Sequence, residues 1–183
     1  MKLPIPRPAS DTPAVRALCS ELVPGGVPDV LRIDAPQWAK VDNCTENIKS
    51  VIALHGGTAE YGWQLMETIP DVLLEAEFHA VWVDQESSKH EVTPKIVPGW
   101  KQVVFLPDPE LVYEGHQIDN VRRPLVHDPL VDEFIKAAED YFEATNRGDL
   151  ADYHGPLAPS REIQTIQKRQ ERLHLQILTK YFS

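Results

Sequence analysis

The alternation of apolar and polar side chains over Val72–Val83 is the feature that most constrains the fold of this chain. Successive side chains of a β-strand point to opposite faces of a sheet, so a period of two over this length predicts a strand rather than a helix. A second alternating stretch around Trp63 precedes it, across a turn near residues 69–71. The two stretches therefore predict an antiparallel pair of strands.

The predicted strand has one apolar face and one mixed face. The apolar face takes every second residue, namely Val72, Leu74, Ala76, Phe78, Ala80 and Trp82. The mixed face holds Glu75, Glu77 and His79 beside Leu73, Val81 and Val83. Shorter stretches at 90–93 and 102–106 predict further strands, which extend the pair into a small antiparallel sheet. Polar side chains are therefore concentrated on one face of this sheet.

Four stretches with helical spacing of apolar residues accompany the sheet. Each begins at a residue type that caps helices, and proline follows at the first helical position in two of them. These starts are Thr12-Pro13, Asp42-Asn43, Asp128-Pro129 and Ser160. We predict an α+β fold in which a helix packs on a small antiparallel sheet and helices follow at the C-terminus.

The length of 183 residues suits one globular domain, and we predict a single domain over residues 1–183. Its predicted parts are an extended, mobile arm at 1–11, a core of helix and antiparallel sheet at 12–106, a long surface loop at 107–128, and C-terminal helices at 129–183. The loop prediction rests on Pro, Asp, Gly and His residues without a clear period.

The net charge limits the partners. With 28 acidic and 18 basic side chains, the formal charge of −10 would repel phosphates, so we expect neither nucleic acid nor membrane binding. No apolar run approaches the length of a membrane span, and the first residues lack the apolar block of a signal peptide. Two cysteines without a CxxC pair give no disulfide framework. We expect a cytoplasmic protein.

Three residues in chain order predict nucleophilic catalysis. Cys44 begins a predicted helix, His79 lies in the long strand, and Glu91 lies in the next strand. A helix N-terminus and a nearby imidazole both favour the thiolate, the reactive form of cysteine. A carboxylate can then hold the other ring nitrogen of the histidine and fix its tautomer. The trio predicts a cysteine-dependent acyl-transfer enzyme that needs no cofactor.

At these residues the chain resembles the papain-like superfamily, and its transglutaminase-like branch in particular. The resemblance covers Pro36 to Pro94 and rests on Phe78-His79-Ala80-Val81-Trp82 and on Glu91-Val92-Thr93-Pro94. It implies a papain-like helix packed on an antiparallel sheet, and an activity of amide hydrolase, deamidase or transglutaminase type on a protein or peptide substrate. It also implies that Gln37 and the Cys44 backbone N–H stabilise the oxyanion.

Each of the three residues also has a structural interpretation. Free cysteine often packs as a small apolar residue, and a strand histidine can be a hydrogen-bonded core residue. In the third role, Asp84, Glu86 or His90 could replace Glu91. The predicted groove around the trio has four further members, Trp38, Trp63, Glu75 and Glu77, although tryptophan more often packs in a core.

Metal binding is a second hypothesis. Glu75, Glu77 and His79 recur at every second position of one strand, which places two carboxylates and an imidazole on one face. Such a face could bind a divalent metal such as zinc, with Cys44, His55 or His90 completing the site. Alternating glutamates on a solvated sheet face are the simpler explanation.

A noncatalytic acidic inhibitor or adaptor protein is the third hypothesis. Between Arg161 and Lys180 the chain is rich in basic residues, in contrast to its acidic remainder. The apolar side of this predicted helix, with Ile163, Ile166, Leu173 and Ile177, could dock within the chain or pair between two copies in a homo-oligomer.

Overall fold

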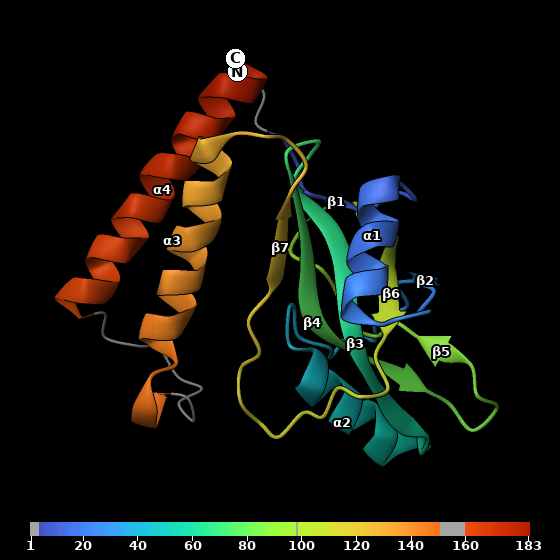
Figure 1. The fold of residues 1–183 in the computed structure, drawn as a ribbon. Helices are drawn as coiled ribbons and strands as arrows, with labels where there is room; N and C mark the ends of the chain where they lie inside the picture. The colour runs from blue at the N-terminus through green and yellow to red at the C-terminus, as the bar shows by residue number, and fades with distance from the viewer. Residues whose placement is uncertain (1–3, 98, 151–159) are drawn as a thin grey trace.

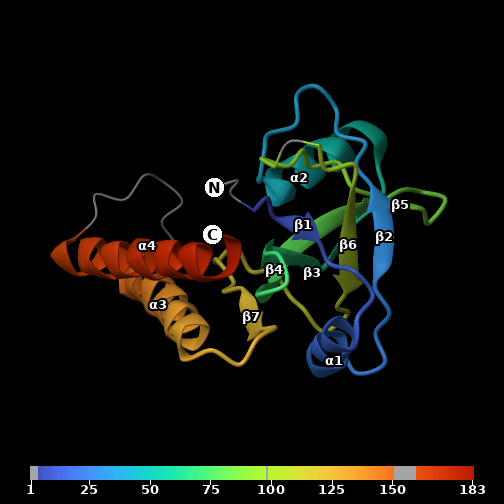
Figure 2. The same ribbon diagram turned by 90° about the horizontal axis from the view of Figure 1, so that it is seen from above.

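The structure, a computed structural model, describes residues 4–97, 99–150 and 160–183. Within these residues it is an α+β fold with an antiparallel sheet and four α-helices, as the sequence predicts. Figure 1 shows α3 and α4 side by side at one side of the sheet, while α1 and α2 lie against other parts of it. The view from above in Figure 2 separates the α3 and α4 pair from the rest in the same way.

The strands are β1 (Arg7–Pro8), β2 (Asp29–Arg32), β3 (Thr58–Ile69), β4 (Leu73–Val83), β5 (Lys89–His90), β6 (Gln102–Pro107) and β7 (Val121–Pro124). The helices are α1 (Pro13–Leu22), α2 (Cys44–His55), α3 (Pro129–Thr145), the short 3₁₀ helix η1 (Gly148–Leu150) and α4 (Arg161–Phe182). The strand order is β2-β6-β3-β4-β5, with β1 paired to β3 and β7 paired to β4.

The long hairpin of β3 and β4 forms the centre of the sheet. Its strands are antiparallel, as predicted, with Trp63 opposite Phe78 and Gly62 opposite His79. A Cβ on Gly62 would lie 2.2 Å from the carbonyl oxygen of Leu106, so glycine allows β6 to approach β3 closely beside His79. The ring of His79 accordingly lies in a tightly packed part of the sheet.

One stretch of β4 is paired on one side only. β7 pairs with the outer edge of β4 as far as Ala76, and β5 pairs with it from Trp82 onward. Between these points β4 pairs with β3, but no strand in the described residues covers its outer edge. We refer to residues 77–81 of β4, on this outer side, as the open edge.

The two N-terminal helices pack over different parts of the hairpin. α1 begins with the Thr12 cap that the sequence predicts, and its apolar stripe packs with residues such as Leu65 and Ala76. α2 packs near the other end of the hairpin, where Ile48 and Ala80 share an apolar cluster. This packing places the first residue of α2 beside the open edge of β4.

The C-terminal helices form a hairpin of their own. The apolar side of α4 packs within the chain, since Ile177 lies in a cluster with Val131 of α3 and Leu73 of β4. Asp128 caps α3 and accepts hydrogen bonds from Lys180 Nζ and the Tyr181 hydroxyl, each at 2.7 Å. None of the helices in the described part of the chain combines the length and apolar character that a membrane crossing requires.

Three segments differ from the sequence predictions. The long loop predicted at 107–128 contains β7, a strand whose arginine-rich sequence has no apolar alternation. β2 lies at residues 29–32, where the sequence predicts no strand. The N-terminal arm is not a free segment, because β1 pairs with Glu67 and Met66 of β3 and Arg7 forms an ion pair with Glu67 at 2.7 Å.

Candidate active site

Cys44 lies at the N-terminus of α2, as predicted, and its thiol has two polar neighbours. It is hydrogen-bonded to the imidazole of His79, and it accepts the backbone N–H of Ala80 on the open edge. The capping residue Asn43 makes no side-chain hydrogen bond to the first turn of α2. The thiol is half-buried and therefore remains accessible.

His79 and Glu91 form a short, buried contact. The Nε2 atom of His79 lies 2.5 Å from Oε2 of Glu91, and the two side chains are 5% and 0% exposed. Because Nε2 faces the carboxylate, Nδ1 is the ring nitrogen that is free to serve Cys44. The structure thus brings the three predicted residues together in the order thiol, imidazole, carboxylate.

Local backbone contacts hold Glu91 in place. Its Oε1 accepts the backbone N–H of Thr93 at 2.7 Å, and its own carbonyl accepts the N–H of Asp34 at 2.9 Å. The hydrogen bond from Asp34 belongs to a parallel β-bridge between Ile33 and Glu91. The carboxylate therefore has a defined orientation toward His79.

Asn47 joins the start of α2 to the segment that follows Glu91. Its side chain accepts the backbone N–H of Lys40 at 2.9 Å and donates to the Lys40 carbonyl at 2.8 Å. It also donates to the Thr93 hydroxyl at 3.3 Å. This buried amide fixes the position of Cys44 relative to Glu91, since α2 and the Glu91 segment share it.

Lys95 is a fourth charged member of the site. Its Nζ lies 3.3 Å from Glu91 Oε2 and 3.3 Å from His79 Nε2, and its side chain is 7% exposed. No sequence pattern predicts this contact, because Lys95 follows Pro94 in a segment without periodic structure. The site is therefore a buried network of two cationic groups, one carboxylate and one thiol.

These neighbours shift the acid–base properties of the trio. Burial by itself raises the pKa of Cys44, but the hydrogen bond and charge of His79, the Ala80 N–H and the charge of Lys95 outweigh it and lower the pKa. Burial also opposes the charged form of His79, whereas Glu91 favours it strongly and the pKa rises to about 9. Burial raises the pKa of Glu91, but His79 and Lys95 lower it by more, so the pKa falls below its ordinary value. The arrangement favours a thiolate beside an imidazolium.

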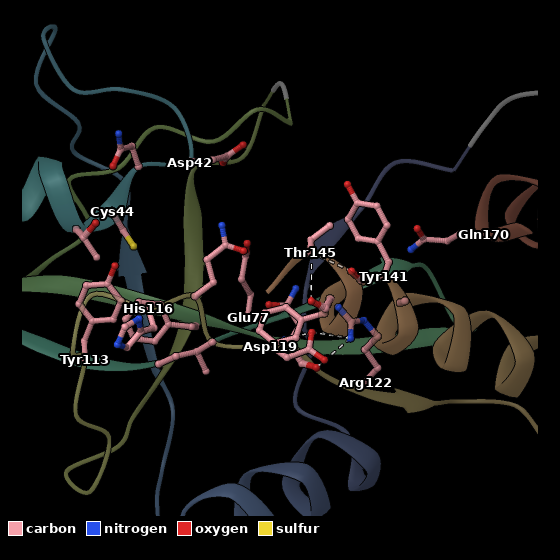
Figure 3. A pocket seen from close by; sticks show the side chains of 18 residues that line it. Asp42, Cys44, Glu77, Tyr113, His116, Asp119, Arg122, Tyr141, Thr145 and Gln170 are labelled. Atoms are coloured by element: carbon pink, nitrogen blue, oxygen red, sulfur yellow. Dashed lines mark hydrogen bonds and ion pairs between the residues drawn. The ribbon is translucent and has the colours of Figure 1, made fainter. Parts of the chain in front are cut away.

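The thiol opens onto a cavity of about 450 Å³. Figure 3 shows Cys44 and Tyr113 at one side of this space and Tyr141 and Thr145 of α3 at the other, with Glu77 between them. The loop that joins β6 to β7 contributes Tyr113, whose ring stacks on Phe78 of β4 with centroids 4.9 Å apart. The sequence predicts a long surface loop here, and its residues have no periodic pattern that would single out Tyr113.

The remaining predicted site residues lie elsewhere. Gln37 is exposed in a turn before α2 and is not among the residues that line the cavity. Trp38 is 44% exposed and also lies outside the cavity lining. Trp63 is buried in the core beneath α1 and donates its indole N–H to Asp108 at 2.9 Å. Of the predicted groove residues, Glu77 lines the cavity.

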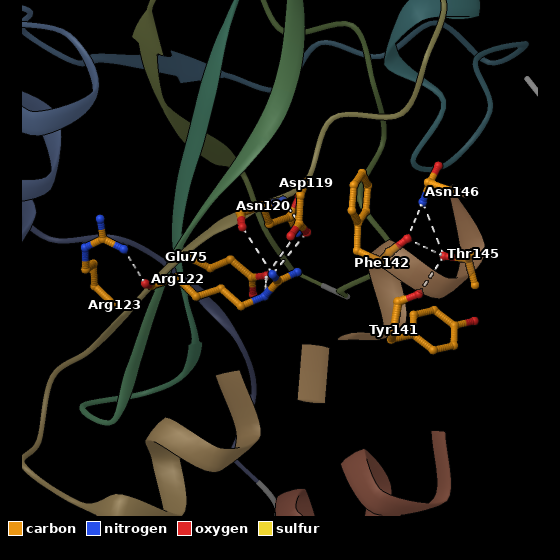
Figure 4. A network of polar contacts seen from close by, with 9 residues as sticks. All are labelled: Glu75, Asp119, Asn120, Arg122, Arg123, Tyr141, Phe142, Thr145 and Asn146. Carbon is orange, nitrogen blue, oxygen red and sulfur yellow. Dashed lines mark hydrogen bonds and ion pairs between the residues drawn. The ribbon is translucent and has the colours of Figure 1, made fainter. Parts of the chain in front are cut away.

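The residues proposed as a metal site have other partners. Glu75 receives hydrogen bonds from Arg122 Nε at 3.0 Å and from Asn120 Nδ2 at 2.9 Å, in the network of Figure 4. His79 is bound to Glu91. A metal ion on this face would have to replace both contacts. In the described part of the chain, no group of three or more His, Cys, Asp or Glu side chains is arranged to hold a metal ion.

The alternative candidates for the third role form a separate contact. His90 Nε2 lies 2.8 Å from Asp84 Oδ2 at the hairpin turn between β4 and β5. Glu86 is exposed in the same turn. Glu91 is therefore the carboxylate that contacts His79.

Comparison of the chain with protein-family models, with curated proteins and with solved structures found no match.

Substitution of Lys95 by glutamine tests the electrostatic role of the ammonium group. Because Lys95 lowers the pKa of both Cys44 and His79, its removal should raise both. We expect the midpoint of Cys44 alkylation against pH to move upward by up to about one unit. Lys101→Gln, at an exposed position, is the matched control. An unchanged midpoint in Lys95→Gln would show that this charge has no influence on the thiol.

Proposed function

We propose that this chain is a cysteine-dependent acyl-transfer enzyme with Cys44 as nucleophile, His79 as general base and acid, and Glu91 as the group that orients His79. The observation that supports it best is the 2.5 Å contact between His79 Nε2 and Glu91 Oε2, on a ring that is also hydrogen-bonded to the Cys44 thiol. A papain-like arrangement, of the transglutaminase-like type, is part of the same proposal.

The mechanism follows from the roles of the three groups. The Sγ thiolate of Cys44 attacks a carbonyl carbon, and a C–S bond forms as the carbonyl oxygen becomes an oxyanion. The His79 imidazolium then gives its proton to the leaving nitrogen or oxygen, whose bond to carbon breaks. This leaves a thioester on Cys44 and a neutral imidazole, which Glu91 holds in one tautomer.

The acyl group leaves by the reverse sequence. His79 takes a proton from water or from an amine, and the resulting nucleophile attacks the thioester carbon. The C–S bond breaks and the thiolate returns beside the imidazolium. Water gives hydrolysis or deamidation, whereas an amine gives transfer, so the three activities share one intermediate. The chemistry of the second nucleophile decides between them.

The oxyanion needs hydrogen-bond donors close to Sγ. Gln37 does not line the cavity, so the backbone N–H of Cys44 in the uncapped first turn of α2 is the better candidate. The side chain of Asn43 lines the cavity next to Cys44 and could add a second donor. One such donor contributes about 3 kcal/mol to transition-state stabilisation in related chemistry.

An acyl-enzyme assay tests this function without knowledge of the natural substrate. With p-nitrophenyl acetate, we expect a burst of p-nitrophenol equal to the enzyme concentration, followed by a slower steady rate. Mass spectrometry of the trapped protein should find one acetyl group on the peptide that contains Cys44. Cys44→Ser should lose both signals, whereas Cys19→Ser, at the buried second cysteine, should keep them.

If acetylation is found on surface lysines and proceeds at the same rate in Cys44→Ser, the chain does not catalyse acyl transfer through this cysteine.

A further inference from the structure

The outer side of β4 presents backbone groups beside the nucleophile that no strand in the described part of the chain covers. The carbonyl of Val72, directly before β4, accepts the Leu125 N–H at 2.8 Å on the outer side of the strand. Backbone groups alternate in direction along a strand, so the N–H and C=O groups of even-numbered residues of β4 point outward. The Ala80 N–H, which is donated to Cys44, has this direction. Phe78 therefore directs both its N–H and its C=O to the open edge.

The open edge has room for a bound segment. The distance from Ala76, the last residue paired with β7, to Trp82, the first residue paired with β5, is roughly 20 Å at about 3.3 Å per residue. Glu77 and Phe78, which belong to this stretch, line the same cavity as Cys44. An extended segment that entered the cavity would thus meet unpaired backbone groups and the thiol together.

We propose that the open edge binds the substrate as an extended polypeptide strand. One substrate residue is hydrogen-bonded to the N–H and C=O of Phe78. A substrate carbonyl within two residues of that residue is presented to Cys44. The inference rests on the proposed acyl transfer by Cys44 and names its substrate as an extended peptide or protein segment. Backbone hydrogen bonds of this kind give affinity, while alternate side chains give selectivity.

The two faces of β4 set the side-chain preference. The substrate residue opposite Phe78 shares the face on which Phe78 stacks with Tyr113 and Tyr61, at centroid distances of 4.9 and 6.0 Å. An apolar side chain fits that face. The two substrate residues that flank this residue lie on the other face, which is the face of Glu77.

The charge near Glu77 favours basic neighbours. Asp42 lines the same cavity, and its charge acts on Glu77. Burial raises the pKa of Glu77, whereas the charges of His79 and Lys95 lower it. The charges of Glu75 and Asp42 raise it, and the pKa stays above its ordinary value. A lysine of the substrate would add a positive charge beside Glu77 and Asp42. The preferred segment therefore alternates basic and apolar residues.

Peptide acyloxymethyl ketones test the inference directly. The probe acetyl-Lys-Leu-Lys-Gly acyloxymethyl ketone is compared with its Glu-Leu-Glu counterpart, and with versions that carry one N-methyl group at each peptide nitrogen in turn. The rate of Cys44 alkylation is measured for each probe, and iodoacetamide is the control without a peptide. Amide hydrogen exchange at Phe78 is followed by nuclear magnetic resonance in the two adducts.

We expect the lysine probe to react about tenfold faster than the glutamate probe, and N-methylation at one position to reduce the rate about tenfold, because one hydrogen bond is lost. Exchange at the Phe78 amide should slow in the peptide adduct and stay unchanged after iodoacetamide. Equal rates for all N-methyl probes and unchanged exchange at Phe78 would overturn strand binding while Cys44 still reacts. A Cys44 that reacts with neither reagent would overturn this inference and the proposed function together.

Discussion

The variant His79→Gln should lose acyl transfer by about 10³-fold relative to the wild type. His79 lies between the thiol of Cys44 and the carboxylate of Glu91, and it is buried. A glutamine amide can still donate a hydrogen bond to Glu91, but it can neither accept nor release a proton in the reaction. The rate of p-nitrophenol release after the burst, measured at pH 7, reports the loss.

His90→Gln is the matched control for this variant. His90 also lies in a strand and also contacts a carboxylate, with Nε2 2.8 Å from Asp84, but it is separate from Cys44. We expect its activity to equal that of the wild type. Circular dichroism of both variants establishes that they are folded. If folded His79→Gln keeps wild-type activity, His79 is not the general base.

The variant Glu91→Gln should destabilise the fold by about 3 kcal/mol at neutral pH. Glu91 is fully buried and faces His79 at 2.5 Å and Lys95 at 3.3 Å. A glutamine can still accept the Thr93 N–H, but it removes the negative charge that faces two buried cationic groups. Urea unfolding measures the change in the free energy of unfolding. Glu86→Gln, at an exposed carboxylate of the β4–β5 turn, is the control and should change little.

The pH dependence of stability gives an independent test of Glu91. The pKa of His79 rises to about 9 in the folded chain, above its ordinary value of 6.5. Its contribution to stability is therefore fully present below about pH 6.5 and is lost as the pH rises through 9. The lowered pKa of Cys44 acts in the opposite direction, since it stabilises the fold above the ordinary thiol pKa and this is lost as the pH falls.

Glu91→Gln should remove the part of this pH dependence of stability that comes from His79. Without the carboxylate the pKa of His79 falls, so the difference in unfolding free energy between wild type and variant should shrink as the pH rises from 6.5 to 9. A difference that stays constant over this range would mean that the charge of Glu91 does not act on His79.

The hairpin and the helix that carry the trio were predictable because their signals are local. The period of two over Val72–Val83 defines β4 and the faces of its side chains, including that of His79. The apolar spacing after Asn43 and the glycines after His55 define α2. With a cysteine at the first position of that helix, the sequence already indicates a nucleophile near the sheet.

The rest of the site depends on contacts between distant parts of the chain. β7 is short, and its Arg122 and Arg123 pair with Glu75 and Glu21 rather than with an apolar core. Lys95 and Tyr113 lie in segments without periodic structure, where a sequence pattern gives no direction for a side chain. Trp63 shares the face of Phe78, but α1 covers its end of the hairpin, so it joins the core. Such arrangements follow from tertiary packing and not from local preference.

The rate of alkylation of Cys44 by iodoacetamide as a function of pH, read by mass spectrometry of the digested protein, distinguishes a thiolate–imidazolium site from an ordinary thiol. Cys19, whose pKa is raised by burial, is the internal control in the same chain. We predict that Cys44 reacts well below the pH range of an ordinary thiol, about 8.5, and that His79→Gln removes this advantage. A Cys44 that reacts like a simple thiol in both proteins would contradict the thiolate–imidazolium site and the function proposed for it.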